Sequence, residues 1–178
     1  MNKEGSFMPI IFVMIASLMI AFLWDKFIFI KDFVHIILDP SAGWLLNWNL
    51  IIGMTLIVFL ISLFSTLVQK FATDQKTLRE LKNEQKEMQE EMKKYNKQPE
   101  KMAELSRKQM DFFKRNFKLN SRPIIFTGIP FILFFRWFQD FFGILGNPKF
   151  FGFMDWLIFY LLFSIVFSSI LRKALKVV

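Results

Sequence analysis

Long apolar runs without charge constrain the fold of this chain more than any other feature. Residues 7–24 and 50–69 contain no charged side chain, and residues 123–142 and 153–171 are almost as apolar. About 20 residues of helix match the roughly 30 Å hydrocarbon core of a bilayer. No stretch shows the ten-residue alternation of a membrane β-strand. The sequence therefore predicts an all-α integral membrane protein with these four spans.

The composition supports a membrane protein and excludes several other classes. Hydrophobic residues make up 54% of the 178 positions, and 25 are phenylalanine, which is more apolar surface than a soluble domain of this length can bury. The absence of cysteine excludes disulfides and thiolate metal sites. The single histidine, His35, has no neighbouring ligand set, so we interpret it as a polar residue at the membrane interface. We expect neither a metal nor a cofactor.

The first apolar run can be interpreted as a signal peptide or as a retained anchor. Lys3 precedes it, as a basic residue precedes the apolar core of a signal peptide. The run is long for that role, however, and no small-residue cleavage site occurs before Trp24. We favour an N-terminal membrane anchor over residues 1–24, added to a three-helix core.

The basic residues predict the orientation. Of 23 Lys and Arg residues, 15 lie in the segment 70–122. Because basic loops remain on the cytoplasmic side, this segment and the tail 172–178 should face the cytoplasm. A loop beside a membrane explains the charge better than nucleic-acid binding does. The segments 25–49 and 143–152 are poor in Lys and Arg and should lie outside, so both termini are expected in the cytoplasm of a plasma-membrane protein.

Two segments outside the spans also have helical patterns. Residues 26–38 are amphipathic but too short and too charged to span, so we expect a helix along the outer interface. In the segment 70–122, apolar positions recur at alternating spacings of three and four, which predicts an antiparallel coiled-coil hairpin rather than a solvated linker. The turn should lie at residues 96–99, with Pro99 as the first residue of the second helix. The first seam comprises Leu78, Leu81, Gln85, Met88, Met92 and Tyr95.

No catalytic constellation is visible, so we expect no enzyme, and polar residues within the spans are the remaining functional signal. Polar residues of the second and last runs recur along one helix face each, and Thr127 lies near the cytoplasmic end of the third. Together these faces would enclose a hydrophilic groove that opens towards the hairpin. The alternative is that they form ordinary hydrogen bonds between membrane helices. The residues are Thr55, Ser62, Thr66, Gln69, Thr127, Tyr160, Ser164 and Ser168, with Arg172 ending the last face.

An arginine lies well inside the third run. Asp140 follows Arg136 by four residues, so the two side chains share a helix face and can form an ion pair. Arg136 is also close enough to the outer interface for its guanidinium to reach water. We expect an interfacial anchor, with a charge at the outer end of the groove as the alternative.

The order of these features resembles the YidC-type membrane protein insertase superfamily, in particular its small archaeal YidC-like branch. The resemblance covers roughly residues 39–175 and includes the stretch LDPSAGWLLNWNLIIGMTLIVFLISLFSTLVQKFATDQKTLRELK. It implies an insertase that shelters the hydrophilic part of a client in its groove, without using a nucleotide. Nascent membrane proteins would be its partners. The basic hairpin is a candidate docking surface for ribosomes, which the sequence alone does not decide.

The resemblance also has consequences for individual residues. Flexible thioethers suit contact with varied apolar clients, although for Met88 and Met92 a place in the hairpin core is the stronger interpretation. Bacterial members carry an arginine in the first core helix, whereas residues 50–69 here have no charge. The methionines concerned are Met88, Met92, Met102 and Met110.

Two other functions are compatible with the same features. A small ion channel or transporter could use the polar faces, although the spans lack deep acidic residues. A membrane tether could recruit a soluble partner through the hairpin. It would tolerate leucine at Thr55, Ser62, Ser164 and Ser168.

Overall fold

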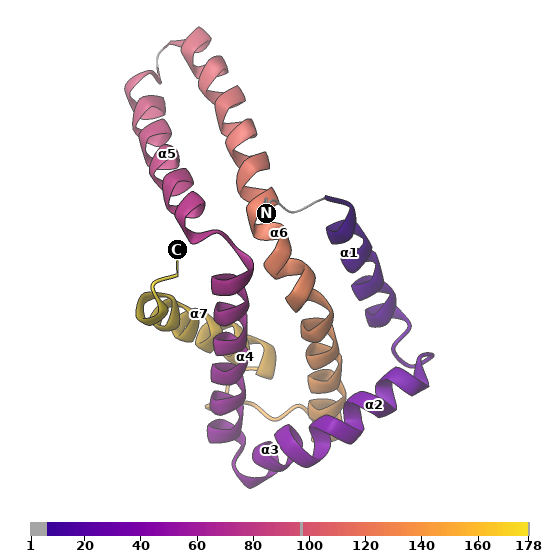
Figure 1. Ribbon diagram of the computed structural model, residues 1–178. Coiled ribbons are helices and arrows are strands. Elements are labelled where there is room, and N and C mark those ends of the chain that lie inside the picture. The colour runs from indigo at the N-terminus through magenta and orange to yellow at the C-terminus, as the bar shows by residue number, and fades with distance from the viewer. Residues whose placement is uncertain (1–6, 97, 178) are drawn as a thin grey trace.

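The chain folds into helices joined by short connections (Figure 1). The computed structural model describes residues 7–96 and 98–177. The first six residues of the predicted anchor, Lys97 in the predicted turn and the last residue of the tail lie outside this range. The elements are α1 (Phe7–Phe22), α2 (Ile28–Leu38), the π-helix η1 (Asp39–Gly43), α3 (Trp44–Trp48), α4 (Leu50–Ala72), α5 (Gln75–Lys94), α6 (Pro99–Ile144) and α7 (Trp156–Leu175).

In the described part of the chain, three helices are long and apolar enough to cross a membrane. They are α4, the Ser121–Ile144 part of α6, and α7. The first apolar run forms the 16-residue helix α1, which packs along α6. At 1.5 Å per residue α1 is about 24 Å long, short of a roughly 30 Å hydrocarbon core. Its crossing of the membrane therefore stays a prediction.

Helix α6 is a single 46-residue helix that contains Pro123 and Pro130. The expected boundary between the hairpin and the third span, at residues 122 and 123, therefore lies inside a helix. A proline removes one backbone hydrogen bond, but membrane helices tolerate it where nearby groups support the backbone. The carbonyls that lose a backbone donor are those of Leu119 and Phe126, four residues before each proline. The hydroxyls of Ser121 and Thr127 bond to other carbonyls, those of Lys118 at 2.7 Å and Pro123 at 2.8 Å.

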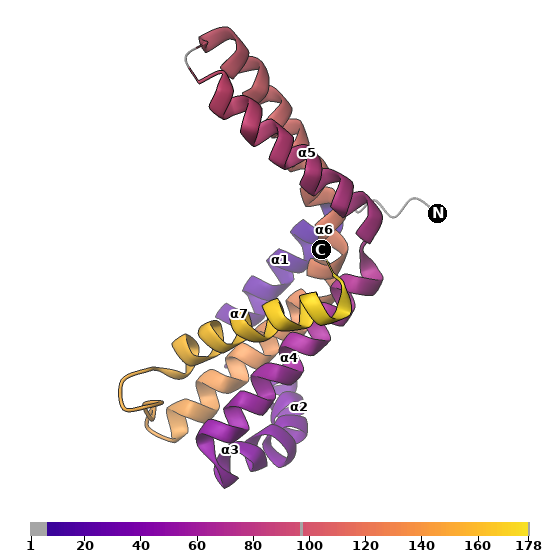
Figure 2. The same ribbon diagram turned by 90° about the vertical axis from the view of Figure 1, so that its left-hand side faces the viewer.

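Helix α5 and the first part of α6 form the hairpin that projects from the bundle (Figures 1 and 2). Asp74 caps the start of α5 by accepting from the backbone N–H groups of Lys76 and Thr77. An ion pair of 2.6 Å between Arg115 and Glu84 joins the two helices. A coiled-coil register stays a prediction. The buried contact consists of Leu78, Leu81, Met88, Leu105, Phe112 and Leu119, with Met92 and Tyr95 beside it.

The helices of the bundle are held together by a core rich in aromatic residues. Helix α4 packs chiefly against α7, which crosses it obliquely (Figure 2). At the start of α4, Gly53 allows α3 to approach closely, because a Cβ at this position would lie 2.5 Å from the carbonyl oxygen of Leu45. The largest fully buried side chains include Trp24, Trp137, Phe138, Phe142, Phe150 and Phe159.

Candidate functional site

The bundle has two ends, which differ in character. At the hairpin end, α4 leads into α5 and α7 terminates; at the loop end lie α2, α3 and the connection between α6 and α7 (Figure 1). Polar side chains collect at both ends, and an apolar gap lies between them.

A polar cavity of about 350 Å³, here named the hairpin-end pocket, lies where the hairpin meets the bundle. It brings together Gln69 and Arg172, the last members of the two predicted polar faces. Leu78, Leu81 and Phe112 supply its apolar part. Lys82, Gln85 and Asn116 of the hairpin complete the lining. The sequence pattern placed Gln69 and Arg172 on their faces, but the hairpin residues opposite them were not predicted as site residues.

The deeper residues of the α4 polar face are buried. Ser62 and Thr66 are 3% and 2% exposed, and the Thr66 hydroxyl donates to the Ser62 carbonyl at 2.7 Å. This side of α4 faces α7, since Phe59, one turn before Ser62, contacts Phe167 edge-on at 5.5 Å. Among the described residues, nothing hydrogen-bonds to the Ser62 hydroxyl. The helix contact thus buries a hydroxyl whose hydrogen-bonding capacity is unused.

The other predicted groove residues mostly satisfy their hydroxyls within their own helices. Thr55 donates to the Ile51 carbonyl at 2.7 Å, and Ser164 donates to that of Leu161 at 2.9 Å. Ser168 is half-buried. Tyr160 is 6% exposed, and its ring contacts Phe135 of α6 at 5.0 Å. Helices α4 and α7 pack together, whereas Thr127 lies on α6 and its hydroxyl bonds within that helix.

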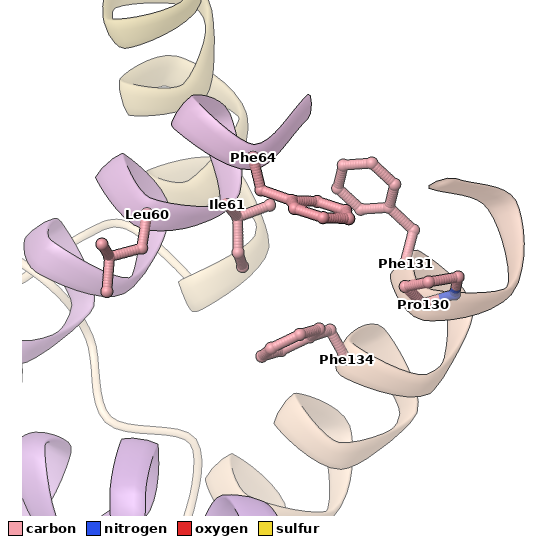
Figure 3. Close-up of a pocket in the computed structure, with 6 residues that line it drawn as sticks. All are labelled: Leu60, Ile61, Phe64, Pro130, Phe131 and Phe134. Atoms are coloured by element: carbon pink, nitrogen blue, oxygen red, sulfur yellow. The ribbon is translucent and has the colours of Figure 1, made fainter. Parts of the chain in front are cut away.

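An apolar cavity of about 280 Å³, the lateral pocket, separates α4 from α6 (Figure 3). Figure 3 shows the rings of Phe64 and Phe131 close together at one margin, with Phe134 projecting towards α4. Leu60 and Ile61 of α4 and Pro130 of α6 complete the lining. The sequence does not indicate this site, because leucine, isoleucine and phenylalanine within an apolar run carry no distinguishing signal.

At the loop end, the carboxylate of Asp140 on α6 contacts three nitrogen atoms from the N-terminal part of the chain. Asp140 Oδ2 accepts from Trp24 Nε1 at 2.7 Å and lies 3.2 Å from Lys31 Nζ and 3.3 Å from His35 Nε2. The other nitrogen of His35 lies 3.1 Å from the carboxylate of Asp39. His35 is thus more than an interfacial polar residue, because it bridges two carboxylates. The described residues contain no group of three or more side chains able to hold a metal ion.

The expected ion pair between Arg136 and Asp140 is not formed; Trp24, Lys31 and His35 contact the Oδ2 atom of Asp140 instead. Arg136 instead donates from Nη1 to Gln139 Oε1 at 2.7 Å, and its guanidinium lies 5.7 Å from the Trp24 ring. Its Nε is buried and has no partner among the described residues. Arg136 therefore lies beside the α1–α2 corner rather than between α4 and α7.

Lys31 forms ion pairs with Asp25 at 2.9 Å and Asp140 at 3.2 Å, and its side chain is 31% exposed. The hydrogen bond to Asp25 is the largest cause that raises the pKa of Lys31, and the contact with Asp140 adds to it. A negatively charged setting therefore holds this lysine in its charged form.

The hairpin methionines are not equivalent. Met88 is buried between the two helices, Met92 packs beside it and Met102 is half-buried. Met110 is 58% exposed. Met110 is therefore the most accessible of the four for contact with another molecule.

The comparisons with known proteins give one match. A model of the family described as integral membrane protein EMC3/TMCO1-like matches residues 35–147, more than half of the chain. The matched part begins in α2 and extends just beyond the end of α6. No curated protein and no solved structure matches significantly.

Proposed function

This chain belongs to the EMC3/TMCO1-like family of integral membrane proteins, within the Oxa1/YidC/Alb3 insertase superfamily, and on that premise we propose that it inserts client transmembrane segments into the bilayer. Membership and three candidate spans make it a membrane-embedded protein, which is consistent with an insertase role in general. The observation that carries the specific proposal is the combination of a polar pocket at the hairpin end and an apolar lateral pocket between two spans.

The hydrophilic part of a client would enter at the hairpin-end pocket. Gln69, Gln85 and Arg172 offer hydrogen-bond donors where α4 and α7 end. The Ser62 hydroxyl lies two turns deeper along α4, buried against α7, and a client would reach it only where these two helices part. Polar groups at such depth lower the cost of moving an unsatisfied backbone or polar side chain across the hydrocarbon.

The apolar part of the client would pass the lateral pocket. Phe64, Phe131 and Phe134 present only apolar surface there, so a client helix loses no hydrogen bond on contact. Such a site favours any sufficiently apolar segment, which suits a protein that handles varied clients. Insertion by this route transfers polar groups between sites and makes or breaks no covalent bond, so no nucleotide and no catalytic residues are needed.

The remaining features form part of the same proposal. We place the hairpin and both termini in the cytoplasm of a plasma-membrane protein of the archaeal YidC-like branch, with α1 as an additional anchor. Nascent membrane proteins are the proposed clients. The exposed Met110 is the proposed hairpin contact for clients, and basic hairpin residues the proposed docking point for ribosomes.

A reconstituted insertion assay tests the proposal. Purified protein in liposomes would receive a single-span client, and protease protection of its short hydrophilic tail would report insertion. Leu60→Trp should fill the lateral pocket and slow insertion. Leu162→Trp, at an exposed position of α7, is the matched control and should leave insertion unchanged.

Three outcomes of the assay would contradict the proposal. One is an equal effect of the two tryptophan variants. Another is insertion that does not depend on the protein. Ion conductance by the purified protein, with no effect on client insertion, would favour a channel instead.

A further inference from the structure

The hairpin-end pocket contains two cations whose charges are not neutralised within the described part of the chain. The side chains of Lys82 and Arg172 both line it, and neither forms an ion pair or a side-chain hydrogen bond with another described residue. We propose that this pocket binds the phosphate headgroup of an anionic membrane lipid. This inference does not rest on client insertion, although the client is proposed to enter the same pocket, so that a bound lipid and a client would compete for it.

The position of the pocket matches the headgroup level of a bilayer. Gln69 and Arg172 both lie three residues before the ends of their helices, α4 and α7. Both helices are candidate spans, so their ends should lie near the boundary between hydrocarbon and headgroups. The other wall of the pocket is formed by the base of the hairpin. A headgroup bound here would contact the spans and the hairpin together.

The lining has the chemistry that a phosphodiester requires. The guanidinium of Arg172 can form two parallel hydrogen bonds to phosphate oxygens, and Lys82 supplies a second positive charge. The amide of Gln69 adds a neutral donor. Leu78 and Phe112 provide an apolar floor for the glycerol carbons and the start of the acyl chains. A volume of about 350 Å³ is within the usual range of small-molecule sites.

The nearby acidic residues do not neutralise this pocket. Glu84 pairs with Arg115 at 2.6 Å, and Asp74 caps the start of α5. Arg79 donates to the carbonyl oxygen of Lys176 at 3.2 Å and so holds the C-terminal tail against α5. Cations at a membrane boundary attract anionic lipids, each contributing roughly 1 kcal/mol. The apolar floor and the membrane position favour a lipid over a soluble phosphate.

The test measures lipid affinity by native mass spectrometry of the full-length protein in detergent. Phosphatidylglycerol, phosphatidylcholine and inorganic phosphate would be titrated separately. The double variant Lys82→Gln/Arg172→Gln should bind phosphatidylglycerol about thirtyfold more weakly, the product of two such contributions. The control Lys93→Gln/Arg107→Gln removes the same charge far along the hairpin and should retain wild-type affinity. The charge-conserving pair Lys82→Arg/Arg172→Lys should also bind, which shows that these positions tolerate substitution.

Each other result would overturn the proposal. Equal losses in the two glutamine variants would mean attraction by general charge rather than a site. Equal affinity for phosphatidylglycerol and phosphatidylcholine would remove the role of the anionic headgroup. Displacement of the lipid by inorganic phosphate at similar concentrations would identify a site for soluble anions. Displacement by an acidic peptide, with no lipid binding of its own, would assign the pocket to a protein ligand.

Discussion

The indole Nε1 of Trp24 donates a 2.7 Å hydrogen bond to the carboxylate of Asp140, which lies 116 positions further along the chain. The indole is fully buried, and the bond fastens the corner between α1 and α2 to the loop end of α6. Lys31 and His35 approach the same carboxylate oxygen. Asp140 is therefore one point at which the N-terminal segment is held to the bundle; Trp137 Nε1, which donates to Asp39 at 2.8 Å, provides another.

Replacing Asp140 by alanine should destabilise the protein by about 1–3 kcal/mol, because the buried Trp24 donor would be left without a partner. Thermal unfolding of the detergent-solubilised protein measures the effect. The control is Asp155→Ala, which removes an exposed ion pair with Lys149 at the same end and should cost less than about 1 kcal/mol. Equal costs for the two variants would show that Asp140 does not fasten the N-terminal segment.

The stability of the folded protein should fall at strongly alkaline pH, because Lys31 then loses its proton. Its pKa in the folded protein lies above the ordinary value of 10.5 because Asp25 and Asp140 stabilise the charged form. A raised pKa means that the folded state binds the proton more tightly, so the contribution is complete below pH 10.5 and is lost as pH rises through the folded-state value. Unfolding midpoints across this range should decline less steeply in Lys31→Met than in the wild type. Identical slopes would exclude this contribution.

Gly53→Ala should be strongly destabilising. The new Cβ would lie 2.5 Å from the backbone oxygen of Leu45, and neither helix backbone can move as a flexible side chain could. Overpacking of this kind typically costs about 1–3 kcal/mol. Gly143→Ala is the control, since no atom lies within 4 Å of the position that its Cβ would occupy. Thermal unfolding compares the two, and an unchanged midpoint for Gly53→Ala would contradict the close packing of α3 on α4.

Ser62→Ala should slow client insertion without lowering the stability of the protein. The Ser62 hydroxyl is buried without a partner among the described residues, so its removal should leave stability unchanged or raise it by about 1 kcal/mol. Thr66→Val, which removes a 2.7 Å hydrogen bond, should cost about 1 kcal/mol. If Ser62 serves a client, insertion should slow in a protein that is at least as stable as the wild type. Wild-type insertion by Ser62→Ala would remove Ser62 from the proposed site.

The sequence predicted the helical membrane fold because apolar runs of spanning length have few other stable solutions. It did not predict that α6 is continuous, since a proline such as Pro123 is compatible with either a helix end or the interior of a membrane helix. The spacing of Arg136 and Asp140 allowed an ion pair. The competing donors Trp24, Lys31 and His35 come from a segment more than 100 residues away, which no local pattern can indicate.

The candidate site was predictable only in part. Gln69 and Arg172 ended two polar faces, and the structure places both in the hairpin-end pocket. The residues of the opposite wall could not be predicted, because their position depends on the angle at which the hairpin leaves the bundle. That angle is set by tertiary packing. The lateral pocket exists because α4 and α6 are separated. Leucine and phenylalanine at positions such as Leu60 and Phe134 would be equally compatible with two helices in direct contact.

Site-specific photocrosslinking to a stalled, single-span nascent chain in proteoliposomes tests the central claim most directly. Probes at Gln85 and Phe134 sample the hairpin-end and lateral pockets, and probes at Leu162 and Ile165 sample exposed positions of α7. The insertase proposal predicts strong crosslinks at the first two positions that require a client with an apolar span. Crosslinks of equal strength at all four positions would contradict it.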